Sequence, residues 1–343
     1  MRFRFRRRYR YFAWLVGVVA GSMLMENVPA AQAEPVKIGV LRIISAGPVF
    51  IALDKGFFAA EGLDPKLVIF DNAVPMAMGA TAGDIDFGVS ALSGALYNLA
   101  AHDALRIIAA SAREAPGFQA TAYVVANRAF AAGLRSLKDL PGHSVSVPVF
   151  GSPPHYSMAL LAEKYGYSLE SVRLVALGSI ANQVSGLIGG QTDAGLIQAT
   201  AVMPALSRKE AVLLGFVGDE TPFQLSAVYT ATRTANDRRS TVEKFLRAYR
   251  KGTTAYHAAF IGADERRKDG ETAPETLAIL ARHIGQSPEQ IERAISYMDA
   301  DARLDVDDVL HQLAWYHAQK LLKQPVDPDH IIDRRFVIPL PKH

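Results

Sequence analysis

The stretch GDIDFGV (residues 83–89) decides the fold, because the same phrase returns as GQTDAGL (residues 190–196). Both copies read Gly-x-x-Asp-x-Gly followed by an aliphatic residue, and they begin 107 residues apart. The first glycine suits a left-handed helix end, and the aspartate suits the turn that follows. Each copy is therefore predicted to end a helix and begin a strand. Two similar α/β halves are expected, although unrepeated α/β units also use this turn chemistry.

The sequence around the first copy alternates strand-like and helix-like segments. Strands are predicted at 36–42, 66–70 and 85–89, and helices at 48–62, 74–83 and 90–102, with Ser90 as the N-cap of the last helix. Short apolar strands separated by helices favour parallel pairing, with helices on both faces of the sheet. The first half is therefore predicted to be an α/β unit.

The second copy lies in a similar arrangement. Strands are predicted at 143–150, 172–177 and 192–197, and helices at 151–166 and 181–190. Two extended segments, 120–128 and 223–233, are expected to connect the halves. The tail beyond residue 236 is mostly helical in pattern, and its acidic run 299–308 is expected to be a solvated helix entry. The predicted fold class is α/β, with two lobes, each a mainly parallel sheet flanked by helices, two crossings between them and a helical C-terminal tail.

The N-terminus has the pattern of a cleaved signal peptide, residues 1–33. An arginine-rich start precedes a largely apolar stretch of fifteen residues (11–25), and Ala-Gln-Ala (31–33) fits a small-x-small cleavage site. A membrane anchor is the alternative, but fifteen residues are short for a span of about 20. Without this segment the chain has 31 basic and 33 acidic residues. A basic nucleic-acid-binding surface is therefore not expected.

Several kinds of chemistry have no support in the sequence. The chain has no Cys, which excludes disulfides, thiolate metal sites and cysteine nucleophiles. Its nine His residues form no metal-binding spacing, and there is no Gly-rich nucleotide loop. No catalytic residue, metal or cofactor is predicted.

Four further segments are informative together: 47–70, 83–91, 134–166 and 189–199. They resemble one family, the periplasmic substrate-binding proteins of ABC importers, and the resemblance covers roughly residues 36–235. More narrowly, the chain is similar to the branch that binds nitrate, sulfonates, taurine and thiamine precursors. The resemblance implies a type II periplasmic-binding-protein fold that closes over a ligand. Lobe one would comprise residues 34–124 and 230–343, and lobe two residues 125–229.

A ligand is expected in the loops that follow the predicted strands, because open α/β sheets bind ligands beyond the carboxyl ends of their strands. Helices that start there offer unpaired N–H groups to an anion. Neutral donors are expected to hold the ligand. Arg42 ends the first strand and is expected to pair at the surface, with contact to an anionic ligand as the alternative. The serines have helix capping as an alternative role. The predicted ligand-binding residues are Ser45, Gly47, Asn72, Ser90, Ala91, Gly151, Ser152, His155, Gln183 and Gln198.

The resemblance implies a function of capture and delivery. The mature protein would be a periplasmic monomer that binds a small organic anion, such as a sulfonate, carboxylate or nitrate-like ion. It would deliver this ligand to an ABC permease and its ATPase. Three alternatives stay open. The first is a binder of a thiamine-precursor pyrimidine or another small aromatic, and the second is an enzyme of the same fold resembling chorismate dehydratase. The third is a ligand-sensing protein that reports to a membrane kinase rather than to a permease.

Overall fold

The computed structural model describes residue 1 and residues 32–341. The predicted signal peptide, residues 1–33, lies almost entirely outside the described residues and stays a prediction. Residues 33–343 form one compact unit, and its strands build two five-stranded sheets and one small sheet.

The first sheet has the order β2-β1-β3-β12-β4. Strand β1 pairs in parallel with β2 and β3, whereas β12 is antiparallel to β3 and β4. The strands are β1 (Glu34–Val40), β2 (Leu63–Ile69), β3 (Phe87–Ala91), β4 (Leu105–Ala110) and β12 (Ser226–Ala231).

The second sheet repeats this plan in the order β8-β7-β9-β6-β10. Here β7 pairs in parallel with β8 and β9, and β6 is antiparallel to β9 and β10. The strands are β6 (Thr121–Ala126), β7 (Ser144–Val147), β8 (Arg173–Ala176), β9 (Ala194–Gln198) and β10 (Ala211–Phe216). The predicted α/β class and the pair of matched halves are confirmed.

The antiparallel strand of each sheet is the one that follows a crossing of the chain between the sheets. Strand β6 follows the strands of the first sheet and enters the second, and β12 returns the chain to the first. The crossing segments pair in a small sheet of β5 (Ala112–Glu114), β11 (Phe223–Gln224) and β13 (Tyr297–Met298). The predicted lobe boundaries, 124/125 and 229/230, fall inside β6 and β12. The lobe assignment stays a prediction.

The aspartate of the repeated phrase makes the same backbone hydrogen bonds in both halves. The Asp86 carboxylate accepts the backbone N–H of Lys37 in β1 at 2.7 Å, and that of Asp193 accepts the N–H of Ser144 in β7 at 3.0 Å. In turn, the backbone N–H of Asp86 donates to the carbonyl of Lys37, and that of Asp193 donates to the carbonyl of Ser144. The phrase therefore connects the start of β3 to the middle of β1, and the start of β9 to the start of β7.

The first glycine of each phrase has a left-handed backbone and a packed neighbour. Gly83 and Gly190 have φ of +88° and +74°. A Cβ on Gly83 would collide with the guanidinium of Arg233, and one on Gly190 would lie 2.8 Å from Nε of Arg128. These arginines follow the equivalent strands β12 and β6. The two halves therefore share side-chain packing as well as strand order.

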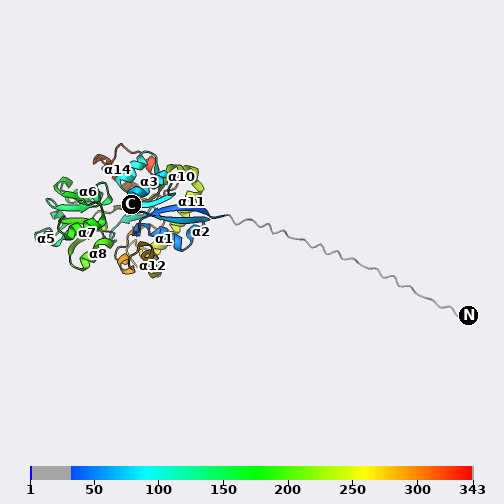
Figure 1. Cartoon of the computed structure of the whole chain (residues 1–343), viewed down its shortest axis with the longest axis horizontal. Coiled ribbons are helices and arrows are strands. Elements are labelled where there is room, and N and C mark those ends of the chain that lie inside the picture. The colour runs from blue at the N-terminus through cyan, green and yellow to red at the C-terminus, as the bar shows by residue number, and fades with distance from the viewer. Residues whose placement is uncertain (2–31, 342–343) are drawn as a thin grey trace. The chain divides into compact units, whose positions relative to one another are not determined.

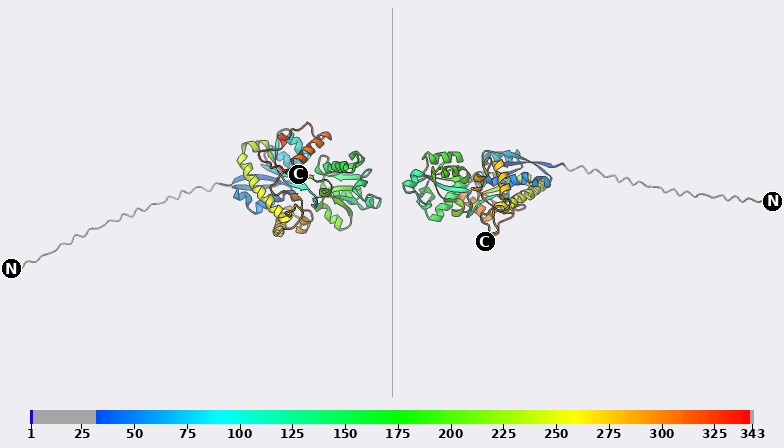
Figure 2. Two further views of the ribbon diagram at one scale, coloured as in Figure 1. Left: turned by 180° about the vertical axis from the view of Figure 1, so that it is seen from behind. Right: turned by 90° about the horizontal axis from the view of Figure 1, so that it is seen from below.

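The helices cover the faces of the two sheets, as Figures 1 and 2 show. Those interleaved with the second sheet are α5 (Asn127–Ala131), α6 (Pro153–Tyr165), α7 (Ile180–Ile188), α8 (Ala199–Ser207) and α9 (Val217–Glu220). Those before the first crossing are α1 (Gly47–Asp54), α2 (Phe57–Ala60), α3 (Ala73–Ala82) and α4 (Gly94–Ala101). The C-terminal helices are α10 (Thr232–Asp237), α11 (Arg239–Phe260), α12 (Ala273–Ile284), α13 (Pro288–Glu292), α14 (Val306–Ala318) and α15 (Pro328–Ile331).

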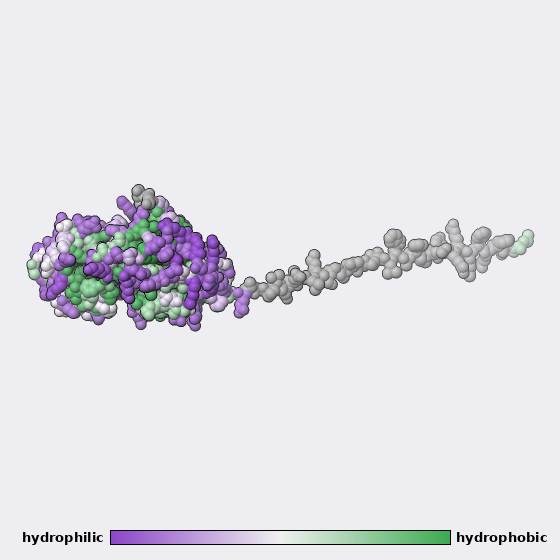
Figure 3. Space-filling view, turned by 90° about the horizontal axis from the view of Figure 1, so that it is seen from above, coloured by the Kyte–Doolittle hydropathy of each residue, from purple (hydrophilic) through white to green (hydrophobic). Residues whose placement is uncertain are grey.

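The long helix α11 packs against the first sheet through aromatic side chains. Its Phe245 ring stacks on Phe87 of β3, with ring centroids 3.8 Å apart and an interplanar angle of 10°. Phe245 and Tyr249 are fully buried, and burial of such rings contributes roughly 1.5–3 kcal/mol each. Apolar and polar residues are interspersed on the face drawn in Figure 3. The C-terminal tail is therefore part of the core around the first sheet.

Two local predictions are wrong. The predicted helix 48–62 is two helices, α1 and α2, because Gly56 between them has φ of +71°. Ser90 is not an N-cap, because strand β3 continues to Ala91 and helix α4 begins only at Gly94. Ser93 caps α4 instead, and its Oγ accepts the N–H of Leu96 at 3.3 Å.

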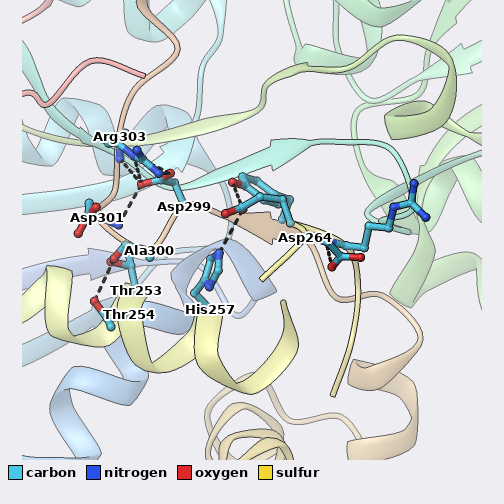
Figure 4. A network of polar contacts seen from close by, with 11 residues as sticks. Thr253, Thr254, His257, Asp264, Asp299, Ala300, Asp301 and Arg303 are labelled. Carbon is cyan, nitrogen blue, oxygen red and sulfur yellow. Dashed lines mark hydrogen bonds and ion pairs between the residues drawn. The ribbon is translucent and has the colours of Figure 1, made fainter. Parts of the chain in front are cut away.

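The acidic run 299–308 is also not simply solvated. Asp299 is 1 % exposed, and its carboxylate accepts hydrogen bonds from the backbone N–H of Asp301 and of Arg303 and from the Arg303 side chain (Figure 4). The hydroxyls of Thr253 and Thr254 on α11 donate to the Ala300 carbonyl. The run fixes the connection between β13 and α14 against α11.

Two kinds of feature are absent from the described residues. No helix in that part of the chain is long and apolar enough to cross a membrane. Likewise, no group of three or more His, Asp or Glu side chains there is arranged to hold a metal ion.

Candidate functional site

A cavity of about 70 Å³ lies where the two five-stranded sheets face the crossings. Its walls come from the connection after β1, the end of β3, the start of β6, the end of β9, the start of β12 and the C-terminal segment. The lining residues are Arg42, Ile43, Ile44, Ser45, Ala91, Ala120, Thr121, Gln198, Thr200, Leu225, Ser226, Ile284, Ala294 and Ser296.

Arg42 is the one charged residue among the described residues that line this cavity. Its Nη1 donates to the carbonyl of His283 at 2.8 Å, in the last turn of α12. The sequence prediction placed Arg42 in a surface ion pair, and the structure shows this backbone anchor instead. A guanidinium has five N–H donors in a planar fork. One donor is engaged by the helix end, so the group is anchored and retains further donors.

Three of the ten predicted ligand-binding residues line the cavity: Ser45, Ala91 and Gln198. Ser45 lies in the short helix between β1 and α1, Ala91 ends β3, and Gln198 ends β9 and precedes α8. They lie beyond the carboxyl ends of parallel strands, where the sequence placed them. Their part in ligand binding stays a prediction.

Four other predicted residues hold local structure around the strand ends. Asn72 caps α3 through Val74 N–H, and Gly47 begins α1 with Leu280 packed against it. Ser90 is fully buried within β3, next to Ala91. The buried side-chain amide of Gln183 donates to the carbonyls of Ser146 and Leu196 at 3.1 and 3.0 Å. None of the four lines the cavity.

The last three predicted residues, Gly151, Ser152 and His155, lie at the start of α6. Ser152 Oγ donates to the carbonyl of Val149, and the Gly151 N–H donates to Nδ1 of His155 at 3.1 Å. The His155 ring packs edge-on against Trp315 of α14, with centroids 5.0 Å apart. Burial lowers the pKa of His155 to about 4, which keeps it neutral. These residues join α6 to the C-terminal tail and do not line the cavity.

Sequence reasoning missed the hydroxyl residues of the cavity. Thr121 and Ser226 begin the antiparallel strands β6 and β12, Thr200 lies in the first turn of α8, and Ser296 precedes β13. The start of an antiparallel strand reaches the same sheet edge as the end of a parallel one. The prediction was based on strand ends alone, so it left out the cavity residues at the starts of β6 and β12.

Close to this site, the crossing strand β5 buries a carboxyl group. Glu114 is fully buried, and its nearest polar neighbours are Thr121 and the backbone of Gly218. In the small sheet, Glu114 is paired with Phe223 of β11. Burial raises the pKa of Glu114 to about 8. The carboxyl is therefore largely neutral at pH 7, which removes the cost of a buried charge.

Solved structures of known proteins share this fold at low sequence identity. The periplasmic aliphatic sulphonate binding protein SsuA from Escherichia coli is 17% identical, with a TM-score of 0.69 over 90% of this chain and 94% of that one. The alkanesulfonate-binding protein SsuA from Xanthomonas axonopodis pv. citri, bound to MOPS, is 18% identical, with a TM-score of 0.67 over 88% and 99%.

A nitrate-binding protein has the same fold. The periplasmic nitrate-binding protein NrtA from Synechocystis PCC 6803 is 12% identical, with a TM-score of 0.67 over 89% of this chain and 87% of that one. Comparison with curated protein sequences found no match. The family model described as NMT1/THI5 like matches residues 44–259. With the two matched sheets, the crossings and the cavity between them, this match shows that the chain belongs to the NMT1/THI5-like family.

Proposed function

We propose that the protein captures a small oxyanion in the cavity between its two sheets. The observation that carries the proposal is the lining: a single guanidinium, from Arg42, among the hydroxyls of Ser45, Thr121, Thr200, Ser226 and Ser296. A planar guanidinium matches the oxygens of a sulfonate, carboxylate or nitrate in a bidentate contact. Hydroxyls supply further donors to the same oxygens.

The start of α8 adds to this preference for negative charge. Gln198 is the N-cap residue of α8, and Thr200 lies in its first turn, at the cavity. A helix N-terminus has unpaired N–H groups and a partial positive charge, worth about 0.3–1 kcal/mol for an anion nearby. The proposed site therefore combines a full charge with a helix dipole.

The cavity favours binding over catalysis. Among the described residues that line it there is no His, Asp, Glu, Lys or Tyr. A general acid or base normally comes from those residue types. The guanidinium of Arg42 in the lining also favours an anion over a neutral pyrimidine, because it forms its strongest hydrogen bonds with charged acceptors. A small anion is the better match on both counts.

In the cell, the proposed role is solute capture in the periplasm. The mature protein, a monomer free of residues 1–33, would deliver its anion to an ABC permease and its ATPase. The sulfonate- and nitrate-binding proteins that share its fold are periplasmic by description. The arrangement of two lobes joined by two crossings supports closure over the ligand.

Anion binding is tested by thermal unfolding of the mature protein in the presence of nitrate, acetate, methanesulfonate and a neutral aminopyrimidine, at constant ionic strength set with chloride. A ligand at 100 times its dissociation constant stabilises the folded state by about 2.7 kcal/mol. We expect at least one of the three oxyanions to raise the Tm by a few degrees and the pyrimidine to leave it unchanged. A rise with the pyrimidine alone would reject the proposal.

A further inference from the structure

The last turn of α12 contributes to the cavity in two ways. Ile284, the final residue of the helix, lines the cavity. The carbonyl of the preceding residue, His283, accepts the hydrogen bond from Arg42 Nη1. The His283 carbonyl that holds Arg42 and the Ile284 side chain that lines the cavity come from adjacent residues. The position of the guanidinium relative to Ile284 is therefore fixed.

This turn is fastened to α1. The His283 ring stacks on Phe50, with centroids 4.7 Å apart and an interplanar angle of 3°, and its Nε2 lies 2.9 Å from Oδ1 of Asp54. Arg282 forms an ion pair with the same Asp54 carboxylate. Helix α12 ends directly afterwards at Gly285, with φ of +80°. The wall at Ile284 is therefore rigidly supported.

Ala294 and Ser296 extend this wall along the segment between α13 and β13. We call Ile284, Ala294 and Ser296 the C-terminal wall. Ile284 and Ala294 are 6 % and 2 % exposed, and α13 contacts α8, whose Thr200 also lines the cavity. The wall thus forms a part of the lining that comes from neither five-stranded sheet.

We propose that the last turn of α12 sets the length of the ligand, an inference that rests on the proposed binding of oxyanions. A water-sized group needs roughly 10–15 Å³ of such a cavity, so about five to seven groups fit. Methanesulfonate has five non-hydrogen atoms and ethanesulfonate six, whereas acetate and nitrate have four. The ligand class is therefore an oxyanion with a short chain of about one or two carbons. Its head binds Arg42, and its methyl group contacts Ile284.

Because the wall is held in place, it is expected to discriminate strongly between ligands of different chain length. A hydrophobic pocket discriminates one methylene by about tenfold to 200-fold. A chain that extends toward this wall beyond the space available has to displace Ile284, which is held through His283, Phe50 and Asp54. Truncating Ile284 to Ala removes three carbons from the wall and leaves the His283 carbonyl in place for Arg42. The variant is therefore expected to change chain-length preference without losing the anion.

The experiment titrates methane-, ethane-, propane-, butane- and hexanesulfonate into the mature wild type and the Ile284→Ala variant by calorimetry. We expect wild-type affinity to fall at least tenfold for each carbon beyond ethanesulfonate. In Ile284→Ala the decline should begin at least one carbon later, with methanesulfonate affinity kept within about threefold. Ile284→Val removes one carbon, serves if the alanine variant does not fold, and is expected to show a smaller change of the same sign.

The matched control is Ile188→Ala, because Ile188 also ends a helix before a glycine but is 43 % exposed and does not line the cavity. It is expected to keep the wild-type profile. Binding of sulfonates with equal profiles in the wild type and both Ile284 variants would overturn this inference and leave the proposed function standing. A wild type that binds no sulfonate, acetate or nitrate would overturn both.

Discussion

Replacing Arg42 with Gln is expected to weaken the binding of methanesulfonate by about tenfold to 150-fold. Arg42 is the only charged residue among the described residues of the cavity, and its guanidinium is anchored by the His283 carbonyl. A hydrogen bond to a charged group is worth about 1.5–3 kcal/mol, and each 1.4 kcal/mol is a factor of ten in affinity. The glutamine side chain would keep a hydrogen-bond donor but lose the charge. Calorimetric titration at constant ionic strength measures the change.

Two companion variants separate charge from geometry. Arg42→Lys keeps the charge but lacks the planar fork, so an intermediate affinity is expected. Arg173→Gln, on the exposed face of β8, removes the same charge from a residue that does not line the cavity, and affinity should stay unchanged. If Arg42→Gln binds methanesulfonate as tightly as the wild type does, Arg42 does not contact the anion.

Replacing Glu114 with Gln is expected to remove a large pH dependence from the stability of the protein. Burial raises the pKa of Glu114 in the folded state from its usual 4.5 to about 8. The unfolded chain therefore releases this proton first as the pH rises, and the stability present below pH 4.5 is lost on the way to pH 8. Each pH unit in that window costs about 1.4 kcal/mol, so a loss on the order of 4 kcal/mol is expected between pH 5 and 8.

Urea unfolding of the wild type and Glu114→Gln at pH 5, 6, 7 and 8 tests this expectation. The neutral amide has nearly the same shape and cannot ionise, so the variant should lose much less stability across the window. Tyr123 and Asp219 face Glu114, and the negative charge of Asp219 adds to the effect on its pKa. Glu292→Gln, at an exposed position on α13, is the control and should follow the wild type. Parallel curves for wild type and Glu114→Gln would show that the Glu114 carboxyl is hydrated.

The repeated phrase was sufficient to predict the two halves of the fold. Its glycines and aspartates have fixed conformational roles, at Gly83 and Asp86 in one copy and Gly190 and Asp193 in the other. The N-cap of α4 was misplaced for a physical reason. Ser90 and Ser93 are equally good caps by residue type, and only the pairing of β3 with β12, far along the chain, extends the strand past Ser90.

The candidate site was only partly predictable for a related reason. The rule for parallel strand ends pointed to the loops that hold Ser45, Ala91 and Gln198. It does not cover the antiparallel strands β6 and β12, whose starts reach the same edge. The C-terminal wall was also missed, because α12 reaches the cavity through packing on α1 and no local pattern at Ile284 indicates that contact.

The most direct test of the account is a crystal structure of the mature protein with bromomethanesulfonate, an anion whose bromine gives an anomalous signal. We predict one bromine peak in the cavity, on the side of the C-terminal wall, with sulfonate oxygens within hydrogen-bond distance of the Arg42 guanidinium. An empty cavity at saturating concentration, or an ordered anion at another site only, would contradict the claim that the two matched halves hold a small oxyanion between them.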